Sequence, residues 1–70
     1  MQDVQERLGE NIRALRKAKG YTQDAFADRA GLNRAHMGEI ERGESNVTIQ
    51  TLKLIADALR VRISDLVAGL

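Results

Sequence analysis

The strongest constraint on the fold of this chain is a helix-start pattern that recurs along its 70 residues. In each copy an apolar residue precedes Thr or Asn, and a second apolar residue follows that polar residue about four positions later. Thr and Asn side chains cap the free backbone N–H groups at a helix start, while the two apolar residues pack across the first turn. The copies are Tyr21-Thr22 with Phe26, Leu32-Asn33 with Met37, and Val47-Thr48 with Leu52. We therefore expect helices over about 23–30 and 33–41, and another from Thr48 through Leu59.

Two further helices are expected at the ends of the chain. Asp3 and Glu6 have the spacing of a capping box, and Gly20 supplies a stop, which predicts a first helix over about 4–19. Its apolar residues recur at helical spacing, namely Val4, Leu8, Ile12 and Leu15. Ile63-Ser64 opens a short last helix, over about 64–69. Because no stretch alternates apolar and polar residues as a strand does, the predicted fold is all-α. We expect a compact five-helix bundle in a single domain over residues 1–70.

The composition excludes several classes of function. Without cysteine and with one histidine, the chain can build neither a disulfide framework nor a clustered metal site. One Tyr, one Phe and no Trp cannot form the stacking platform of single-strand binders. No paired carboxylates frame a pocket and no glycine-rich phosphate loop is present, so we expect neither an enzyme nor a cofactor. No apolar stretch approaches the roughly 20 residues of a membrane span and no signal segment opens the sequence, which indicates a cytoplasmic protein without a membrane partner.

A short turn joins the second and third predicted helices. It consists of Ala30-Gly31-Leu32, and its glycine can adopt the left-handed conformation that commonly ends a helix. Ala25, Ala27 and Ala30 are small enough to let the third helix approach the second closely. The two short helices are therefore expected to meet at a steep angle, as in a helix-turn-helix.

The third predicted helix carries the candidate contacts, because a net charge of +1 does not by itself indicate a nucleic-acid partner. Met37 and Ile40 are its only large apolar residues and share one face, so the other side chains can point outward. In a helix docked in the major groove, the N-terminal residues meet the base edges. The candidate base-reading residues are Arg34, Ala35, Gly38 and Glu39. Arginine can bind guanine through two hydrogen bonds, alanine can touch a thymine methyl, and glutamate can accept from cytosine. Taken alone, this helix fits a solvated surface equally well.

Several segments together carry a family resemblance. They are Ile12–Gln23, Phe26-Ala27, Gly31-Leu32, Ile40–Gly43, Leu52–Val61 and Ser64–Leu66. In these segments the sequence resembles the phage-repressor/Cro-like (XRE) family of helix-turn-helix proteins. The stretch Ile40–Ile49 is also similar to the controller proteins of restriction-modification systems, a subgroup of that family. The resemblance implies a five-helix, lambda-repressor-like domain, dimeric operator binding and a role in transcription regulation.

The resemblance also implies roles for single residues. It makes Arg34, Ala35 and Glu39 the base-facing positions, although an acidic residue at 39 departs from the polar or basic residue common there. It places Gln23 on a DNA phosphate, and the partial positive charge at a helix start favours an anion there as well. Arg42 lies where the family commonly makes another backbone contact.

Other polar residues near the helix starts are candidate contacts to the DNA backbone. They are Thr22, Asn33, His36, Asn46 and Thr48. Helix capping is the alternative role for the threonines, and a plain surface position is the alternative for His36. The resemblance separately implies a structural ion pair between Arg16 and Glu41, which would tie the first helix to the end of the third.

Specific binding to DNA favours a homodimer. One helix reads only a few base pairs, whereas two symmetric copies read half-sites about 34 Å apart. We nominate the apolar residues near the C-terminus as the self-association surface, namely Val61, Ile63, Leu66, Val67 and Leu70. The alternative is that they only close the core. With no room for a sensing domain, no small-molecule ligand is expected.

The rival interpretation is a protein-interaction module. Proteins of this fold also include antitoxins and coactivator-like proteins whose main contacts are with other proteins. Salt dependence discriminates between the two, since a groove binder that neutralises several phosphates loses affinity steeply as salt rises.

Overall fold

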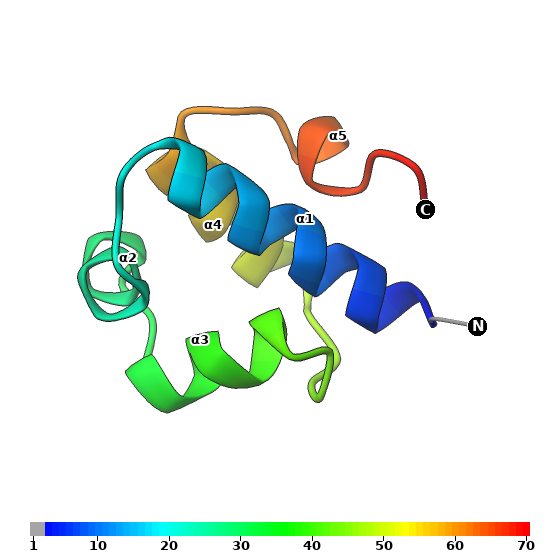
Figure 1. Cartoon of the computed structure of the whole chain (residues 1–70), viewed down its shortest axis with the longest axis horizontal. Helices are drawn as coiled ribbons and strands as arrows, with labels where there is room; N and C mark the ends of the chain where they lie inside the picture. Colours follow the sequence, from blue (N-terminus) through cyan, green and yellow to red (C-terminus); the bar gives the residue numbers. More distant parts are fainter. Residues whose placement is uncertain (1–2) are drawn as a thin grey trace.

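The computed structural model describes residues 3–70 of the chain. Within that range the chain forms α-helices joined by short turns, and no strand (Figure 1). The helices are α1 (Val4–Ala18), α2 (Gln23–Ala30), α3 (Arg34–Glu41), α4 (Ile49–Leu59) and α5 (Ile63–Leu66). The prediction of an all-α fold with five helices is confirmed. None of the helices in this part of the chain is long and apolar enough to cross a membrane.

Each of the four longer helices begins at a side chain that caps it. Oδ1 of Asp3 accepts the N–H of Glu6 at 2.8 Å. The side-chain oxygens of Thr22, Asn33 and Thr48 each accept the N–H group three residues later, at 3.1 Å. Because a cap satisfies one of the free N–H groups of the first turn, it fixes where the helix begins. These capping residues are the ones that the sequence pattern indicates.

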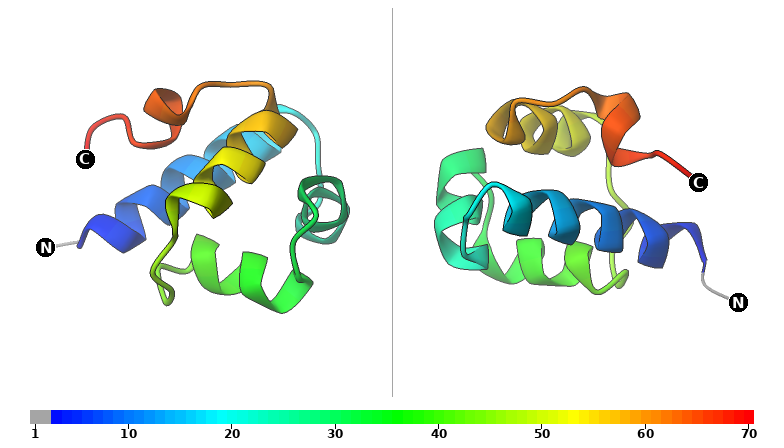
Figure 2. Two further views of the ribbon diagram at one scale, coloured as in Figure 1. Left: turned by 180° about the vertical axis from the view of Figure 1, so that it is seen from behind. Right: turned by 45° about the horizontal axis from the view of Figure 1, so that its top comes forward.

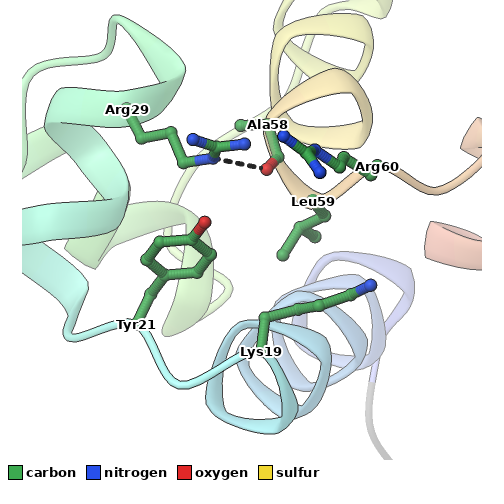
Figure 3. Close-up of a pocket in the computed structure, with 6 residues that line it drawn as sticks. All are labelled: Lys19, Tyr21, Arg29, Ala58, Leu59 and Arg60. Carbon is green, nitrogen blue, oxygen red and sulfur yellow. Dashed lines mark hydrogen bonds between the residues drawn. The ribbon is translucent and has the colours of Figure 1, made fainter.

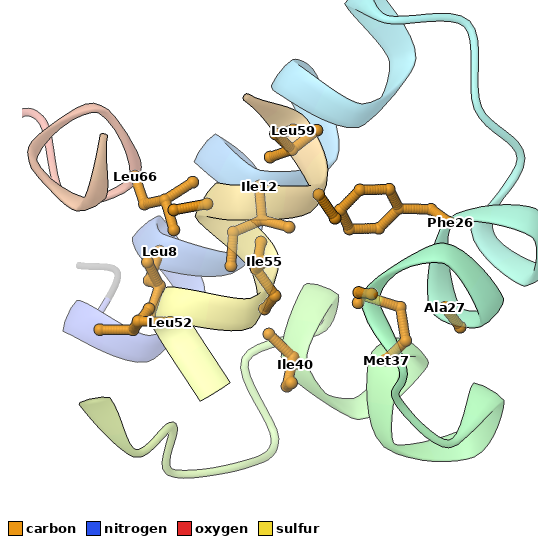
Figure 4. Packing of buried hydrophobic residues seen from close by; sticks show 13 residues of the cluster. Leu8, Ile12, Phe26, Ala27, Met37, Ile40, Leu52, Ile55, Leu59 and Leu66 are labelled. Atoms are coloured by element: carbon orange, nitrogen blue, oxygen red, sulfur yellow. The ribbon is translucent and has the colours of Figure 1, made fainter. Parts of the chain in front are cut away.

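The helices pack around one apolar core. Helix α3 packs against α1 and α2, α2 also contacts α4, and α5 packs against α1 and α4. Figure 2 shows α3 along one side of the molecule and α5 on the other. The large side chains with almost no exposed surface come from all five helices, and Figure 4 shows them meeting in the centre: Ile12, Phe26, Met37, Ile40, Ile55, Leu59 and Leu66. The position of α3 is thus fixed by the same core that holds the rest of the fold.

The turn between α2 and α3 depends on one glycine. Gly31 has a φ of 73°, a left-handed conformation that glycine adopts without steric cost. This geometry lets the N–H of Leu32 donate to the carbonyl of Ala27 at 2.9 Å, while the N–H of Gly31 donates to that of Asp28 at 3.2 Å. The chain then reaches the Asn33 cap directly, so only three residues separate the end of α2 from the start of α3.

A second glycine sets how closely α1 approaches the end of α3. Gly9 is buried, and a Cβ atom at this position would lie 2.5 Å from the carbonyl oxygen of Glu41 and 2.6 Å from that of Ile40. Those atoms belong to the backbone and cannot rotate away. Only a residue without a side chain therefore lets the two helices meet at this distance.

The last helix is shorter than the expected 64–69. Helix α5 spans Ile63–Leu66, and Arg62 rather than Ser64 occupies its N-cap position, where the Arg62 N–H donates to Oδ2 of Asp65 at 2.9 Å. The amide of Asn11 on α1 donates to the carbonyls of Leu66 and Ala68, at 2.9 and 2.8 Å. With those carbonyls bound to α1, the chain leaves the helix after Leu66.

The prediction that Leu66 belongs to a dimer surface is wrong. Its side chain has 0% exposure, because α5 lays it against α1 and α4 as part of the core. Val61, Ile63 and Val67 are half-buried, and Leu70 is 41% exposed. Four of the five nominated residues thus retain accessible surface.

Candidate nucleic-acid interface

Helix α3 has one buried and one open face. Met37 and Ile40 are 0% and 1% exposed and anchor the helix to the core. Arg34, Ala35 and Glu39 are exposed on the other side. In Figure 1 the helix lies along an edge of the molecule, with no other helix beyond it. We call the exposed face of α3, together with the adjoining start of α2 and the turn after α3, the candidate interface.

Arg34 reaches from α3 to two carboxylates on α2. Its Nη2 lies 2.9 Å from Oδ2 of Asp28 and its Nη1 lies 3.6 Å from Oδ2 of Asp24, and its side chain is 59% exposed. The hydrogen bond to Asp28, followed by the charges of Asp28 and Asp24, raises the pKa of the Arg34 guanidinium above its ordinary value. A DNA base would have to compete with these carboxylates for the guanidinium.

Asp24 and Asp28 also belong to the site, although neither was predicted from the sequence. They are spaced four residues apart on α2, which puts both on one face of the helix, and both are exposed. That spacing is the sequence signal from which they could have been predicted. Asp24 closely follows the Thr22 cap, and Asp28 lies one turn further toward α3.

Gly38 does not offer open surface to a base, contrary to the prediction. It is buried, and a Cβ added there would lie 2.9 Å from Nη1 of Arg42 and 3.5 Å from Oε1 of Gln23. The reason is that the Arg42 guanidinium folds back over the last turn of α3. Arg42 also pairs with Glu44, at 3.0 Å between Nε and Oε1.

His36 and Glu39 face each other on α3. Nδ1 of His36 lies 3.8 Å from Oε1 of Glu39, a separation that forms an ion pair only when the imidazole is protonated. The side chain of Glu39 is 48% exposed and that of His36 is 36% exposed. Both side chains are therefore accessible to a groove edge, and they lie close enough to interact with each other.

The end of α3 is fixed by a buried ion pair. Nε and Nη2 of Arg16 donate to the two carboxylate oxygens of Glu41 at 2.7 and 3.0 Å, and the two side chains are 8% and 3% exposed. Nη1 of Arg16 donates to the carbonyl of Tyr21 at 2.8 Å. The hydrogen bond to Glu41 is the main cause that raises the pKa of Arg16, against the opposing effect of burial.

Gln23 belongs to the same cluster in this structure. Its Nε2 donates to Oε1 of Glu41 at 3.2 Å, so the amide that was expected to meet a DNA phosphate is bound inside the protein. The remaining candidates for backbone contact lie at helix starts or in the turn after α3. Thr22, Asn33 and Thr48 act as caps, and Asn46 accepts a hydrogen bond from Gln5 of α1.

Charges on the candidate interface alternate in sign. Arg34 lies beside Asp24 and Asp28, Arg42 beside Glu44, and His36 beside Glu39. These pairs set four carboxylates against two arginines and one histidine, so the face has donors placed for a groove but no excess of positive charge. Attraction of one copy of the face to phosphate is therefore expected to be weak.

Known proteins share this arrangement of helices. A helix-turn-helix family model matches residues 12–66. The chain is 39% identical over 64 residues to control protein C.SmaI of Serratia marcescens, covering 91% of this chain and 76% of that protein. The crystal structure of the restriction-modification controller protein C.AhdI from Aeromonas hydrophila superposes with a TM-score of 0.85 at 36% identity, over 87% of this chain and 92% of that one. The crystal structure of SinR in complex with DNA superposes with a TM-score of 0.81 at 33% identity, over 84% of this chain and 95% of that one.

The fold and the open face of α3 define a helix-turn-helix regulator of transcription, and DNA binding is the activity of this class. More specifically, the chain belongs to the phage-repressor/Cro-like (XRE) helix-turn-helix family. Its relatives are transcriptional regulators, among them control proteins of restriction-modification systems.

Proposed function

We propose that this protein binds a two-fold symmetric site on double-stranded DNA as a homodimer and so regulates transcription. The observation that carries the proposal is the division of α3 into a face buried by Met37 and Ile40 and an exposed face bearing Arg34 and Ala35. Such a helix can enter a major groove without disturbing the core that holds it.

The exposed residues of α3 have distinct chemical roles in this proposal. Arg34 binds a guanine through its two Nη groups once the base displaces the α2 carboxylates. Ala35 contacts a thymine methyl, and Glu39 accepts from the amino group of a cytosine. Thr22, Asn33 and Thr48 hold the duplex backbone from the helix starts and Asn46 holds it from the turn after α3. Arg42 moves away from Gly38 to contact a phosphate.

The homodimer is proposed to form through the apolar residues left on the far side of the bundle. Val61, Ile63, Val67 and Leu70 retain accessible surface around α5. Leu54 on α4 is 44% exposed, and we propose that it also belongs to this surface, although it was not among the residues nominated from the sequence. Leu54→Asp places a charge there, and sedimentation should then show a dimer converted to monomer. A dimer of unchanged stability would remove this surface from the proposal.

Control of restriction-modification genes is the regulatory role that we propose. It is supported by the identity to C.SmaI and the similarity to the structure of C.AhdI. The stretch Ile40–Ile49 carried the same resemblance in the sequence. The proposal predicts that the protein binds a symmetric site in the promoter of a restriction or modification gene.

The decisive experiment selects bound duplexes from a random pool. The parent protein should return a two-fold symmetric site, and Arg34→Ala should weaken the preference at one base per half-site by about ten- to a hundredfold. Lys53→Ala, which removes an exposed cation on α4, is the matched control and should leave every base preference unchanged. If Arg34→Ala lowers affinity equally for all sequences, Arg34 contacts phosphate rather than a base.

A protein-interaction module is the second candidate, and the alternating charges of the candidate interface favour it. A face with an acid beside each cation attracts a polyanion weakly and suits a polar protein surface. Binding to a selected duplex should be compared at about 50 and 200 mM salt, where a groove binder loses orders of magnitude in affinity. Failure to bind any duplex at the lower salt concentration would favour this second candidate.

A further inference from the structure

A cleft lies apart from the candidate interface, between the ends of α1 and α4 and the last turn of α2. Its volume is about 240 Å³, and its lining residues are Lys19, Tyr21, Arg29, Ala58, Leu59 and Arg60. Figure 3 shows Arg29 and Arg60 on either side of the Ala58 carbonyl, with Leu59 between them and Lys19. None of these residues belongs to α3 or to the turn that follows it.

The charge of this cleft is of one sign. Lys19, Arg29 and Arg60 line it, and no acidic residue does. Among residues 3–70 none of the three forms an ion pair, whereas the cations of the candidate interface each lie beside a carboxylate. The carboxyl ends of α1 and α4 each contribute about half a negative charge, so three cations leave a net charge of about +2.

Arg29 is held in place before any ligand arrives. Its Nε donates to the carbonyl of Ala58 at 2.8 Å, and its Cζ lies 5.4 Å from the ring centroid of Tyr21. Both contacts fix the plane of the guanidinium. Within the described part of the chain its two Nη groups donate to no protein acceptor, so they form a free fork that suits an oxyanion.

Arg60 occupies a backbone conformation that disfavours it. It ends α4 with a φ of 60°, and it is the one non-glycine residue with a positive φ among those that the structure describes. Glycine or asparagine serves this position at lower cost. The strain is consistent with a function for the guanidinium that the fold itself does not require.

We propose that this cleft binds a small phosphate monoester. Arg29 and Arg60 bind the phosphate oxygens, Lys19 adds charge from the opposite side, and the apolar part of the ligand lies on Tyr21, which is half-buried. A phosphate monoester dianion matches the net charge of about +2. The volume admits a compact group beside the phosphate and is below that of the usual drug-sized pocket.

Titration of the full chain with phenyl phosphate, followed by NMR chemical shifts, tests the proposal. We expect saturable shifts at the cleft residues with a dissociation constant of about 1 mM or lower, and none with phenol. Arg60→Gly removes one guanidinium while supplying the residue that a positive φ prefers, so it should fold at least as stably as the parent. It should weaken binding about tenfold. Arg13→Gln makes the same charge change on the exposed face of α1, outside the cleft, and should leave binding unchanged.

Three results would overturn the proposal. The first is no saturable shift at ligand concentrations of about 10 mM, and the second is an equal loss of binding in Arg60→Gly and Arg13→Gln, which indicates diffuse electrostatics. The third is displacement of phenyl phosphate by a short duplex of unrelated sequence, which would assign the cleft to nucleic-acid phosphate. Because Arg34→Ala leaves the cleft intact, loss of DNA selectivity in that variant with retained phenyl phosphate binding separates this proposal from the DNA-binding one.

Discussion

The two ends of α3 carry the same kind of interaction in opposite surroundings. At its start Arg34 pairs with Asp28 at 2.9 Å in the open, with side chains 59% and 62% exposed. At its end Glu41 pairs with Arg16 at 2.7 Å, and the side chains of Glu41 and Arg16 are only 3% and 8% exposed. An exposed pair exchanges readily with water or a ligand, whereas a buried pair cannot lose one partner without leaving a charge out of water. The helix is therefore locked at one end and available for binding at the other.

The largest expected effect comes from breaking the locked end. Glu41→Ala leaves the Arg16 guanidinium buried without its carboxylate, and we expect it to lower the free energy of unfolding by about 3–5 kcal/mol. Glu44→Ala removes an exposed partner of Arg42 and should cost less than about 1 kcal/mol. Thermal denaturation of both variants checks the contrast. Equal melting temperatures would mean that the buried pair does not hold α3.

A smaller loss is expected from pushing α1 away from the same end of α3. Gly9→Ala places a Cβ atom against the backbone oxygens of Ile40 and Glu41, which cannot move independently, and should cost about 1–3 kcal/mol in chemical denaturation. Gly38→Ala is the matched control, because its Cβ meets only side-chain atoms of Arg42 and Gln23, which can move, and alanine favours a helix. A larger loss in Gly38→Ala than in Gly9→Ala would contradict this account of the close approach.

The sequence predicts the start of each longer helix well because capping is a local interaction. Asp3, Thr22, Asn33 and Thr48 form their caps with groups only three residues away. The end of α5 could not be predicted in the same way. It depends on Asn11, which binds the Leu66 carbonyl from 55 residues away along the chain.

The candidate site shows the same division between local and distant causes. The outward face of α3 follows from the spacing of Met37 and Ile40, which the sequence contains directly. The burial of Gly38 depends on how the long Arg42 side chain folds, and spacing does not determine that. The ion pair between Arg16 and Glu41 was expected only through the family resemblance, because 25 residues separate the two.

The smallest expected effect tests the available end of α3. Asp28→Asn removes the carboxylate nearest to Arg34 without changing the size of the side chain, and the exposed pair contributes little to folding, so the melting temperature should barely change. DNA affinity should rise about two- to tenfold, because the guanidinium no longer has to leave an acid and one charge that repels phosphate is gone. Asp57→Asn removes an equally exposed acid paired with Lys53 on α4 and controls for net charge.

The comparison of these two variants separates competition from positioning. If Asp28 competes with DNA for Arg34, Asp28→Asn binds the selected duplex more tightly than Asp57→Asn, and the difference shrinks as salt rises. If Asp28 instead holds the guanidinium in the orientation that a guanine requires, Asp28→Asn loses preference at the same base as Arg34→Ala does. That second outcome would mean that the start of α3 is preorganised through α2, and the contrast between a locked and an available end would no longer hold.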